Sequence, residues 1–118
     1  MKYLIGLDVG TSGAKALLID QEGTVLAEST REYPLLTPRP NWAEQHPADW
    51  WEASHTAIAD VIRAAGVAPS DIAGVGLSGQ MHGSVFLDGQ NQVIRPAILW
   101  CDQRTAAQCE ALTEEIGE

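Results

Sequence analysis

A glycine-rich turn near the N-terminus has residue types that could bind a metal-nucleotide. It runs Asp8-Val9-Gly10-Thr11-Ser12-Gly13-Ala14-Lys15 between two apolar segments. Its glycines can turn backbone N–H groups toward an anion, while Thr11 and Ser12 add hydroxyl donors and Lys15 adds a cation. Asp8 would repel a phosphate unless a divalent cation lay between them, and Mg²⁺ commonly binds one or two carboxylates together with phosphate oxygens. The pattern therefore predicts metal-nucleotide binding, with an ordinary hairpin turn as the alternative.

A second candidate site follows the apolar segment 72–77. The sequence there is Gly79-Gln80-Met81-His82-Gly83, with an amide, a thioether and an imidazole between two glycines. Gln80 and His82 can hydrogen-bond hydroxyl groups, and Met81 offers an apolar contact, so the segment is typical of a pocket floor. The alternative is a loop whose histidine is structural.

The same region contains Gly74-Val75-Gly76-Leu77-Ser78-Gly79, which has the spacing of a dinucleotide fingerprint. That fingerprint must follow a strand and open a helix, whereas here it overlaps a predicted strand. A nicotinamide site is therefore not expected.

A third candidate site is Trp100-Cys101-Asp102-Gln103-Arg104, at a predicted junction between a strand and a helix. An aromatic face commonly supports a sugar ring, and Asp102 or Arg104 could bind its hydroxyl groups. In the alternative, Asp102 caps the helix, Arg104 pairs on the surface and Trp100 lies in the core.

Composition limits the classes of partner. The chain has 118 residues, enough for one domain, and a net charge of −9 from 7 basic and 16 acidic residues. This charge disfavours nucleic acid and anionic lipid, so phosphate would have to be held by local amides, one cation or a metal. The apolar runs are far shorter than the roughly 20 residues that span a bilayer. With no signal peptide pattern at the start, we expect a cytoplasmic protein that binds neither nucleic acid nor membrane.

The spacing of apolar residues predicts how these candidate sites are positioned. Three antiparallel strands are expected, over 3–9, 15–19 and 25–33, with the first covered on both faces. A proline-rich loop follows, and then a helix from Pro47 to Gly66. The expected buried face of this helix consists of Trp51, Ile58, Ile62 and Ala65.

The second half of the chain is expected to add shorter elements. Strands are predicted over 72–77, 84–87 and 98–100. Asp102 would cap a final helix. The inner face of that helix would consist of Ala106, Cys109, Leu112 and Ile116.

Four motifs in this order resemble the FGGY carbohydrate kinases. They are Asp8 to Ser12, Asn41-Trp42-Ala43-Glu44-Gln45, Gly79 to Gly83 and Ala97 to Arg104. The Gln-Met-His-Gly form resembles the xylulokinases of that family. The resemblance implies an α/β fold of the ribonuclease-H-like, actin-type ATPase class, with a mixed sheet and flanking helices. It also implies transfer of the ATP γ-phosphate to D-xylulose or a related ketose.

The resemblance also implies roles for individual residues. Asp8 would hold or orient the Mg²⁺-phosphate, and it is the only catalytic and metal-binding residue expected within the chain. The nucleotide phosphates would be lined by Gly10, Thr11, Ser12 and Lys15. The sugar would contact Met81 and His82, with Trp100 as a further pocket wall. Cys101 stands where the family often has asparagine or glutamine.

The family pattern further implies that 1–118 is the N-terminal part of the first kinase domain. The catalytic base, the adenosine pocket and the second domain would lie in a C-terminal part outside this chain, so the isolated fragment should be inactive. Exposed apolar strand edges would favour self-association, including a homo-oligomer. The alternatives are another sugar or polyol kinase of the family (for ribulose, gluconate or glycerol), a chaperone or cytoskeletal ATPase of the same fold, and a non-catalytic sugar-binding or interaction domain.

Overall fold

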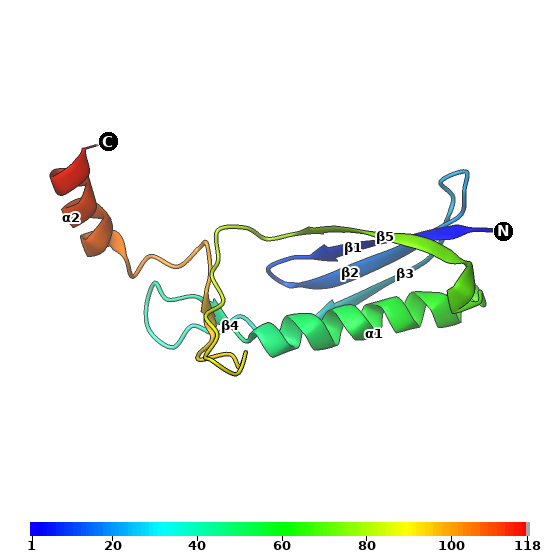
Figure 1. The fold of residues 1–118 in the computed structure, drawn as a ribbon, viewed down its shortest axis with the longest axis horizontal. Coiled ribbons are helices and arrows are strands. Elements are labelled where there is room, and N and C mark those ends of the chain that lie inside the picture. The colour runs from blue at the N-terminus through cyan, green and yellow to red at the C-terminus, as the bar shows by residue number, and fades with distance from the viewer. Residues whose placement is uncertain (118) are drawn as a thin grey trace.

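A mixed four-stranded sheet forms the larger part of the molecule. The computed structural model describes residues 1–117. Strands β1 (Tyr3–Val9), β2 (Gly13–Ile19) and β3 (Val25–Glu32) form the predicted antiparallel meander, and β5 (Ile72–Gly79) lies parallel to β1. The sheet order is therefore β3-β2-β1-β5, with the helix α1 (Pro47–Ala65) along one face (Figure 1). Because β1 and β5 are parallel, their C-terminal ends meet at one edge of the sheet.

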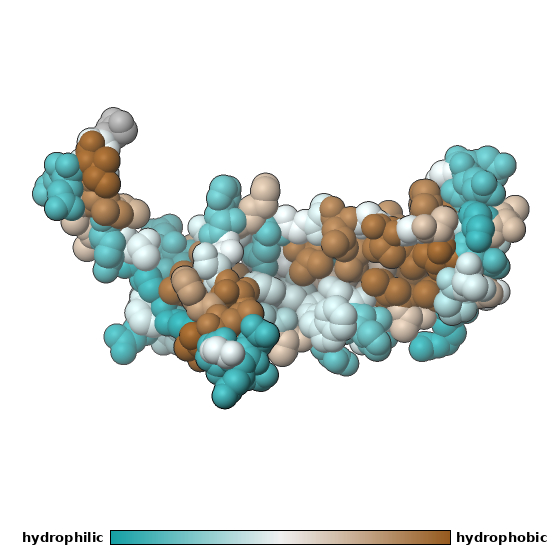
Figure 2. Space-filling model, in the orientation of Figure 1, coloured by the Kyte–Doolittle hydropathy of each residue, from teal (hydrophilic) through white to brown (hydrophobic). Residues whose placement is uncertain are grey.

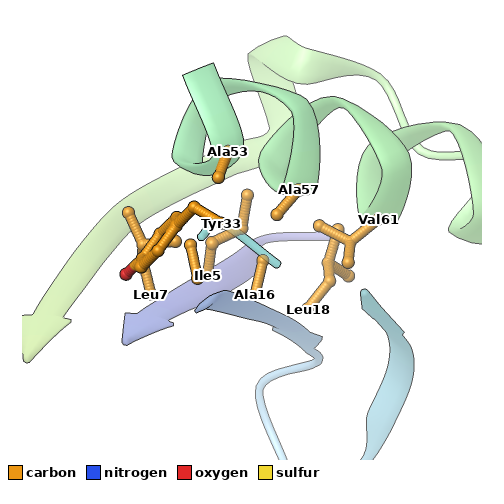
Figure 3. Packing of buried hydrophobic residues seen from close by; sticks show 9 residues of the cluster. Ile5, Leu7, Ala16, Leu18, Tyr33, Ala53, Ala57 and Val61 are labelled. Atoms are coloured by element: carbon orange, nitrogen blue, oxygen red, sulfur yellow. The ribbon is translucent and has the colours of Figure 1, made fainter. Parts of the chain in front are cut away.

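The core lies between α1 and the strands β1 and β2 (Figure 3). Alternate residues of β1 and β2 point to the helix, as the two-residue period of a strand requires. Figure 3 shows Ile5, Leu7 and Leu18 packed beneath Ala57 and Val61. The small side chains of α1 let the helix lie close to the sheet, and Ala57 and Val61 are fully buried there.

The buried face of α1 differs from the one predicted. Ala53, Ala57 and Val61 face the core, while Trp51 is 73% exposed and lies beside His55. The predicted Ile58 and Ile62 lie at the border of this face. Trp51 is therefore the wrong member of the predicted face, whereas the predicted Ala65, like Ile58 and Ile62, packs against the core.

The opposite face of the sheet is open. β1 alternates between buried and exposed residues, so the prediction that it is covered on both faces is wrong within residues 1–117. On the face that α1 covers, β5 lies beyond the helix, so Val75 (50%) and Leu77 (74%), which pair in register with Ile5 and Leu7, are exposed as well. Figure 2 shows a broad hydrophobic surface between β5 and α1. Gly74 to Gly79 all lie inside β5, which confirms that the glycine pattern does not open a helix.

Loops and short elements form the other end of the molecule. There β4 (Glu44–Gln45) pairs with β6 (Ala97–Ile98), and α2 (Ala106–Ile116) follows. A short 3₁₀ turn (Pro69–Asp71) lies at the opposite end, between α1 and β5 (Figure 1). The strand predicted over 84–87 is wrong, because Ser84 and Leu87 form only isolated bridges.

The final helix departs from the sheet. Figure 1 shows α2 at the far end of the molecule, and the described chain measures 58 × 30 × 29 Å. Its radius of gyration is 18.3 Å, against about 13.5 Å for a compact domain of this length. None of the α2 residues is buried, so its predicted inner face packs against nothing within residues 1–117. Among residues 1–117, no helix is both long and apolar enough to cross a membrane.

Candidate functional site

The predicted phosphate turn and the predicted sugar segment lie side by side at the C-terminal ends of β1 and β5. Asp8 pairs in register with Ser78, and Val9 pairs with Gly79. An open cavity of about 370 Å³ lies between the two segments. It is lined by Asp8, Gly10, Thr11, Gly79, Gln80, Met81, His82 and Trp100. The fold thus brings residues from three of the four sequence motifs to one cavity.

The turn between β1 and β2 is tightly fixed. Gly10 N donates to the Gly13 carbonyl at 3.0 Å, and the buried Tyr33 hydroxyl donates to the Gly10 carbonyl. A Cβ at Gly13 would lie 2.6 Å from the Arg31 carbonyl oxygen, so only glycine lets β2 approach β3 here. Within residues 1–117, the N–H groups of Thr11 and Ser12 make no hydrogen bond. These two amides are therefore available to an anion.

Asp8 lies at the rim of the cavity, beside the turn. Its Oδ1 accepts a hydrogen bond from Ser78 Oγ at 2.8 Å, and its Oδ2 would lie 3.7 Å from a Cβ at Gly10. Burial raises the pKa of Tyr33, and the negative charge of Asp8 raises that pKa further. One carboxylate oxygen of Asp8 is thus fixed by a neighbour, and the other faces the turn.

The donor set suits a magnesium ion carried by a nucleotide better than a resident metal. Among residues 1–117, no cluster of three or more His, Cys, Asp or Glu side chains could hold a metal ion. Mg²⁺ usually keeps several waters and takes one or two carboxylates plus substrate phosphates. Asp8 beside the free amides of Thr11 and Ser12 fits that pattern.

Lys15 lies on the open face of the sheet and does not line this cavity. It pairs in register with Asp8 across β1 and β2, and its Nζ is 3.8 Å from Glu28. Both side chains are exposed, so this ion pair holds Lys15 only weakly. Lys15 and Asp8 instead line a neighbouring hollow together with Ser78. Asp8 thus lines both the cavity and the hollow that Lys15 lines.

The Gly79–Gly83 segment, which is predicted to bind the sugar, has an uncommon backbone conformation. His82 has φ 64°, in the left-handed region that non-glycine residues rarely adopt. A Cβ at Gly79 would lie 2.9 Å from the Val9 carbonyl oxygen, so glycine is needed where this segment leaves β5. Met81 is 70% exposed and, with His82, faces the cavity. Such strain is typical of functional sites.

A network of neutral side chains around the buried Gln45 connects these segments and was not predicted from the sequence. Gln45 is 0% exposed, and its Nε2 donates to the Thr11 carbonyl at 2.6 Å. Its Oε1 accepts hydrogen bonds from Trp50 Nε1 at 2.8 Å and from Gln80 Nε2 at 3.0 Å. Trp100 Nε1 donates to the Thr11 hydroxyl at 3.1 Å. We call these five residues the amide network. In the sequence, Gln45 stood out only as the last residue of the Asn41–Gln45 motif, to which no role was assigned.

A second polar group, here called the ion cluster, surrounds Glu44. Arg104 Nη2 lies 2.7 Å from Glu44 and 2.6 Å from Asp102, and Arg95 also pairs with Glu44. The Arg104 guanidinium stacks 3.6 Å from the centre of the Trp42 ring. The cluster joins the loop before α1 to the segment that contains β6.

Asp102 belongs to this cluster and does not cap α2. Its carboxylate accepts hydrogen bonds from the backbone N–H groups of Arg104 (2.8 Å) and Ala43 (2.7 Å), whereas the N-cap of α2 is Thr105. The hydrogen bonds from the Arg104 side chain, helped by these backbone donors, lower the pKa of Asp102 to about 2. Asp102 and Arg104 are thus engaged with each other, although Asp102 also reaches a neighbouring cavity of about 360 Å³ with His82 and Trp100.

Comparison with known proteins agrees with this arrangement. The model for the FGGY family of carbohydrate kinases, N-terminal domain, matches residues 3–118. The chain is 46% identical over 118 residues to a xylulose kinase of Bacillus subtilis and 42% identical over 116 residues to one of Escherichia coli. These two matches include 100% and 97% of this chain, but only 24% and 23% of the lengths of the two relatives.

Solved structures show the same fold. The structure of xylulose kinase from Rhodospirillum rubrum matches with a TM-score of 0.90 at 33% identity, over 98% of this chain and 24% of that one. The predicted ribonuclease-H-like, actin-type fold class is thereby confirmed. The chain spans about a quarter of the length of the relatives that it matches. Because the family model matches residues 3–118, almost the whole of this chain, the chain belongs to the FGGY family of carbohydrate kinases.

Proposed function

We propose that this chain is the N-terminal part of an ATP-dependent kinase that converts D-xylulose to xylulose 5-phosphate. The observation that carries the proposal is the single cavity shared by the phosphate turn and the Gln80-Met81-His82 segment. A kinase must bring a phosphate and a hydroxyl group together in line, which requires two such subsites side by side. The similarity to proteins named xylulose kinase supports the choice of sugar.

On the phosphate side, we assign the turn and Asp8 to Mg-ATP. The free amides of Thr11 and Ser12, with the close backbone at Gly10, would bind phosphate oxygens. Asp8 would hold or orient the Mg²⁺, whose chemistry is to neutralise charge on the phosphates. Lys15 would act through its position beside Asp8, on the adjoining strand. Local donors are needed because the net charge of −9 opposes an anion.

On the sugar side, we assign Met81, His82 and Trp100 to the ketose. A neutral sugar needs hydrogen-bonding groups and an apolar wall, and the exposed Met81 side chain and the Trp100 ring supply the wall. His82 would hydrogen-bond a hydroxyl group. We place the catalytic base and the adenosine site in the rest of the enzyme, because Asp8 lies too close to the phosphate turn to take the proton from the sugar hydroxyl.

The proposal is tested with the full-length enzyme, ATP and Mg²⁺ on D-xylulose, D-ribulose, gluconate and glycerol. D-xylulose should give the highest kcat/KM. A higher value for another of these substrates would replace the proposed sugar but keep the kinase. ATP hydrolysis that no sugar changes would instead indicate an ATPase of the same fold, and no nucleotide dependence at all would indicate a binding domain.

The sugar side is tested separately by His82→Ala. Loss of one hydrogen bond to the sugar should raise the KM for the sugar about tenfold. The KM for ATP should change less than about twofold, because the phosphate turn keeps its own contacts. Both constants are measured by steady-state kinetics on the full-length enzyme. An equal rise in both KM values would contradict a role in sugar binding.

A further inference from the structure

We propose that Gln45 is a positioning residue that holds the phosphate turn at a fixed distance from the sugar segment. Gln45 is fully buried and does not line the cavity, so it would act without touching either substrate. It contacts both segments directly, through the Thr11 carbonyl and the Gln80 side chain. This inference rests on the proposed function, which assigns the two segments to the two substrates.

The direction of every hydrogen bond at Gln45 is determined. The Trp50 indole can only donate, so the group that faces it must be the Gln45 carbonyl oxygen. The Gln45 amide nitrogen then faces the turn, where the Thr11 carbonyl accepts its proton. Trp50 is on α1, which packs on the sheet, so the turn is tied through Gln45 to the core of the domain.

Gln80 extends the same chain of hydrogen bonds to the sugar segment. Its Nε2 donates to Gln45 Oε1 at 3.0 Å, which leaves its Oε1 to accept the Thr11 hydroxyl proton at 3.4 Å. Trp100 in turn donates to the oxygen of that hydroxyl. Thr11 is thus fixed at its carbonyl by Gln45 and at its hydroxyl by Gln80 and Trp100. Only its backbone N–H remains free to meet a phosphate.

The loss of Gln45 should therefore change geometry more than binding. Each segment keeps its own ligand contacts, and Gln80 still bonds the turn directly, but the Thr11 carbonyl and the Gln80 amide lose the shared partner that ties both of them to Trp50 on α1. A misplacement of about 1 Å between reacting groups can lower the rate about a hundredfold. Ground-state binding at each subsite depends on local contacts, so the two KM values should change much less.

The test measures kcat and both KM values for the full-length enzyme with D-xylulose and Mg-ATP. In Gln45→Met, which keeps the length of the side chain without its polar atoms, kcat should fall about 10- to 100-fold and each KM should change less than about threefold. Gln80→Met should lower kcat too. The double variant should be little worse than the poorer single variant, because the two side chains act as one unit.

A matched control separates positioning from general loss of stability. Val61→Ala removes fully buried atoms from the core beneath α1, and Val61 lies about three helical turns along α1 from Trp50, the residue of the amide network on that helix. Its Tm should fall while its kcat stays at the parent value. If Gln45→Met does not fold, Trp50→Phe removes one anchor of Gln45 and should lower kcat about threefold or more.

Three outcomes would overturn the inference. These are a parent-like kcat in a folded Gln45→Met, a parent-like kcat in Trp50→Phe, or fully additive effects of the Gln45 and Gln80 substitutions. A parent enzyme that phosphorylates no sugar would refute the proposed function first, and this inference with it. The two failures are therefore distinguished by the parent enzyme alone.

Discussion

Glu44 and Gln45 are adjacent in β4, are both buried, and belong to two different polar groups. Side chains of successive strand residues point in opposite directions, so Glu44 enters the ion cluster and Gln45 enters the amide network. The first group is charged and joins two loops, while the second is neutral and holds the phosphate turn. The same strand thus supports two kinds of polar contact.

The physical difference between the two groups is their effect on a bound phosphate. A charged side chain at position 45 would act directly on an anion at the turn, whereas an amide joins three partners without adding charge. Glu44 can be charged because two arginines neutralise it. We therefore expect substitutions at the cavity and in the amide network to change catalysis, and substitutions in the ion cluster to change stability. Four predictions test this division, in order of decreasing effect.

The largest effect is expected at the cavity, from Asp8→Asn. Loss of the charge that would orient the Mg²⁺-phosphate should lower kcat about a thousandfold at saturating Mg-ATP. The Tm should change by less than about 2 °C, because Asn can still accept the hydrogen bond from Ser78 and the side chain is exposed. Steady-state kinetics of the full-length enzyme measures kcat, and thermal unfolding measures the Tm. Near-normal turnover would refute the role of Asp8.

In the ion cluster, Glu44→Ala should mainly reduce stability. It removes the carboxylate that Arg95 and Arg104 share, and leaves two guanidinium groups close together. Breaking a buried ion pair from one side is strongly destabilising, so the Tm should fall by about 5–10 °C. The sugar and ATP KM values of the folded enzyme should stay within about twofold. A large rise in either KM at unchanged Tm would show that the two groups are not separate.

Acid pH should distinguish the two groups through Asp102. Its pKa is about 2 in the folded protein and 3.8 ordinarily, so the unfolded chain binds more protons between these values. The stabilisation is therefore complete above about pH 4 and is lost as the pH falls toward about 2. The Tm difference between the parent and Asp102→Asn should narrow over that range. A Tm difference that stays constant between about pH 4 and 2 would contradict the lowered pKa of Asp102.

Two controls make this comparison specific to the ion cluster. Arg31 and Ser29 also lower the pKa of Asp60 to about 2, but Asp60 is present in both proteins and its effect cancels. The amide network contains no carboxylate, so the Tm difference between the parent and Gln45→Met should not narrow between about pH 4 and 2.

The smallest effect is expected at the rim of the ion cluster, from Arg95→Ala. The Arg95 side chain is 44% exposed, while Arg104 is 12% exposed and also pairs with Asp102. Exposed ion pairs contribute little, so the Tm should fall by only about 1–3 °C. Arg104→Ala should lower the Tm clearly more, because it also removes the stacking on Trp42. Equal falls in Tm for the two variants would show that the burial of an arginine does not determine how much it stabilises the ion cluster.

Much of the site followed from local chemistry in the sequence. Asp8 to Ser12 and Gly79 to Gly83 each contain their own turn residues, hydroxyls and glycines, so short-range rules predicted a loop at each place. The parallel pairing of β1 with β5 then places them together, and that pairing joins residues about 70 positions apart. The roles assigned to these residues stay predictions.

The errors arose where long-range packing decides. Asp102 has the position of a helix cap in the sequence, but Ala43 and Arg104 take up its carboxylate. Apolar side chains at helical spacing indicated Trp51, but the sheet favours the small side chains of Ala53 and Ala57. Neither choice is visible in a local pattern, because each depends on the partner that the fold brings near.

The sequence by itself determined the family, the fold class, the three-stranded meander, the long helix and the two segments that form the cavity. These follow from hydrophobic periodicity, turn residues and ordered motifs, all of which act over a few neighbouring positions. Only the tertiary structure decided that Glu44 and Gln45 belong to separate polar groups and that Gln45 joins the two segments. The partners of a buried polar side chain come from distant parts of the chain, and their identity is fixed only when the strands and loops pack together.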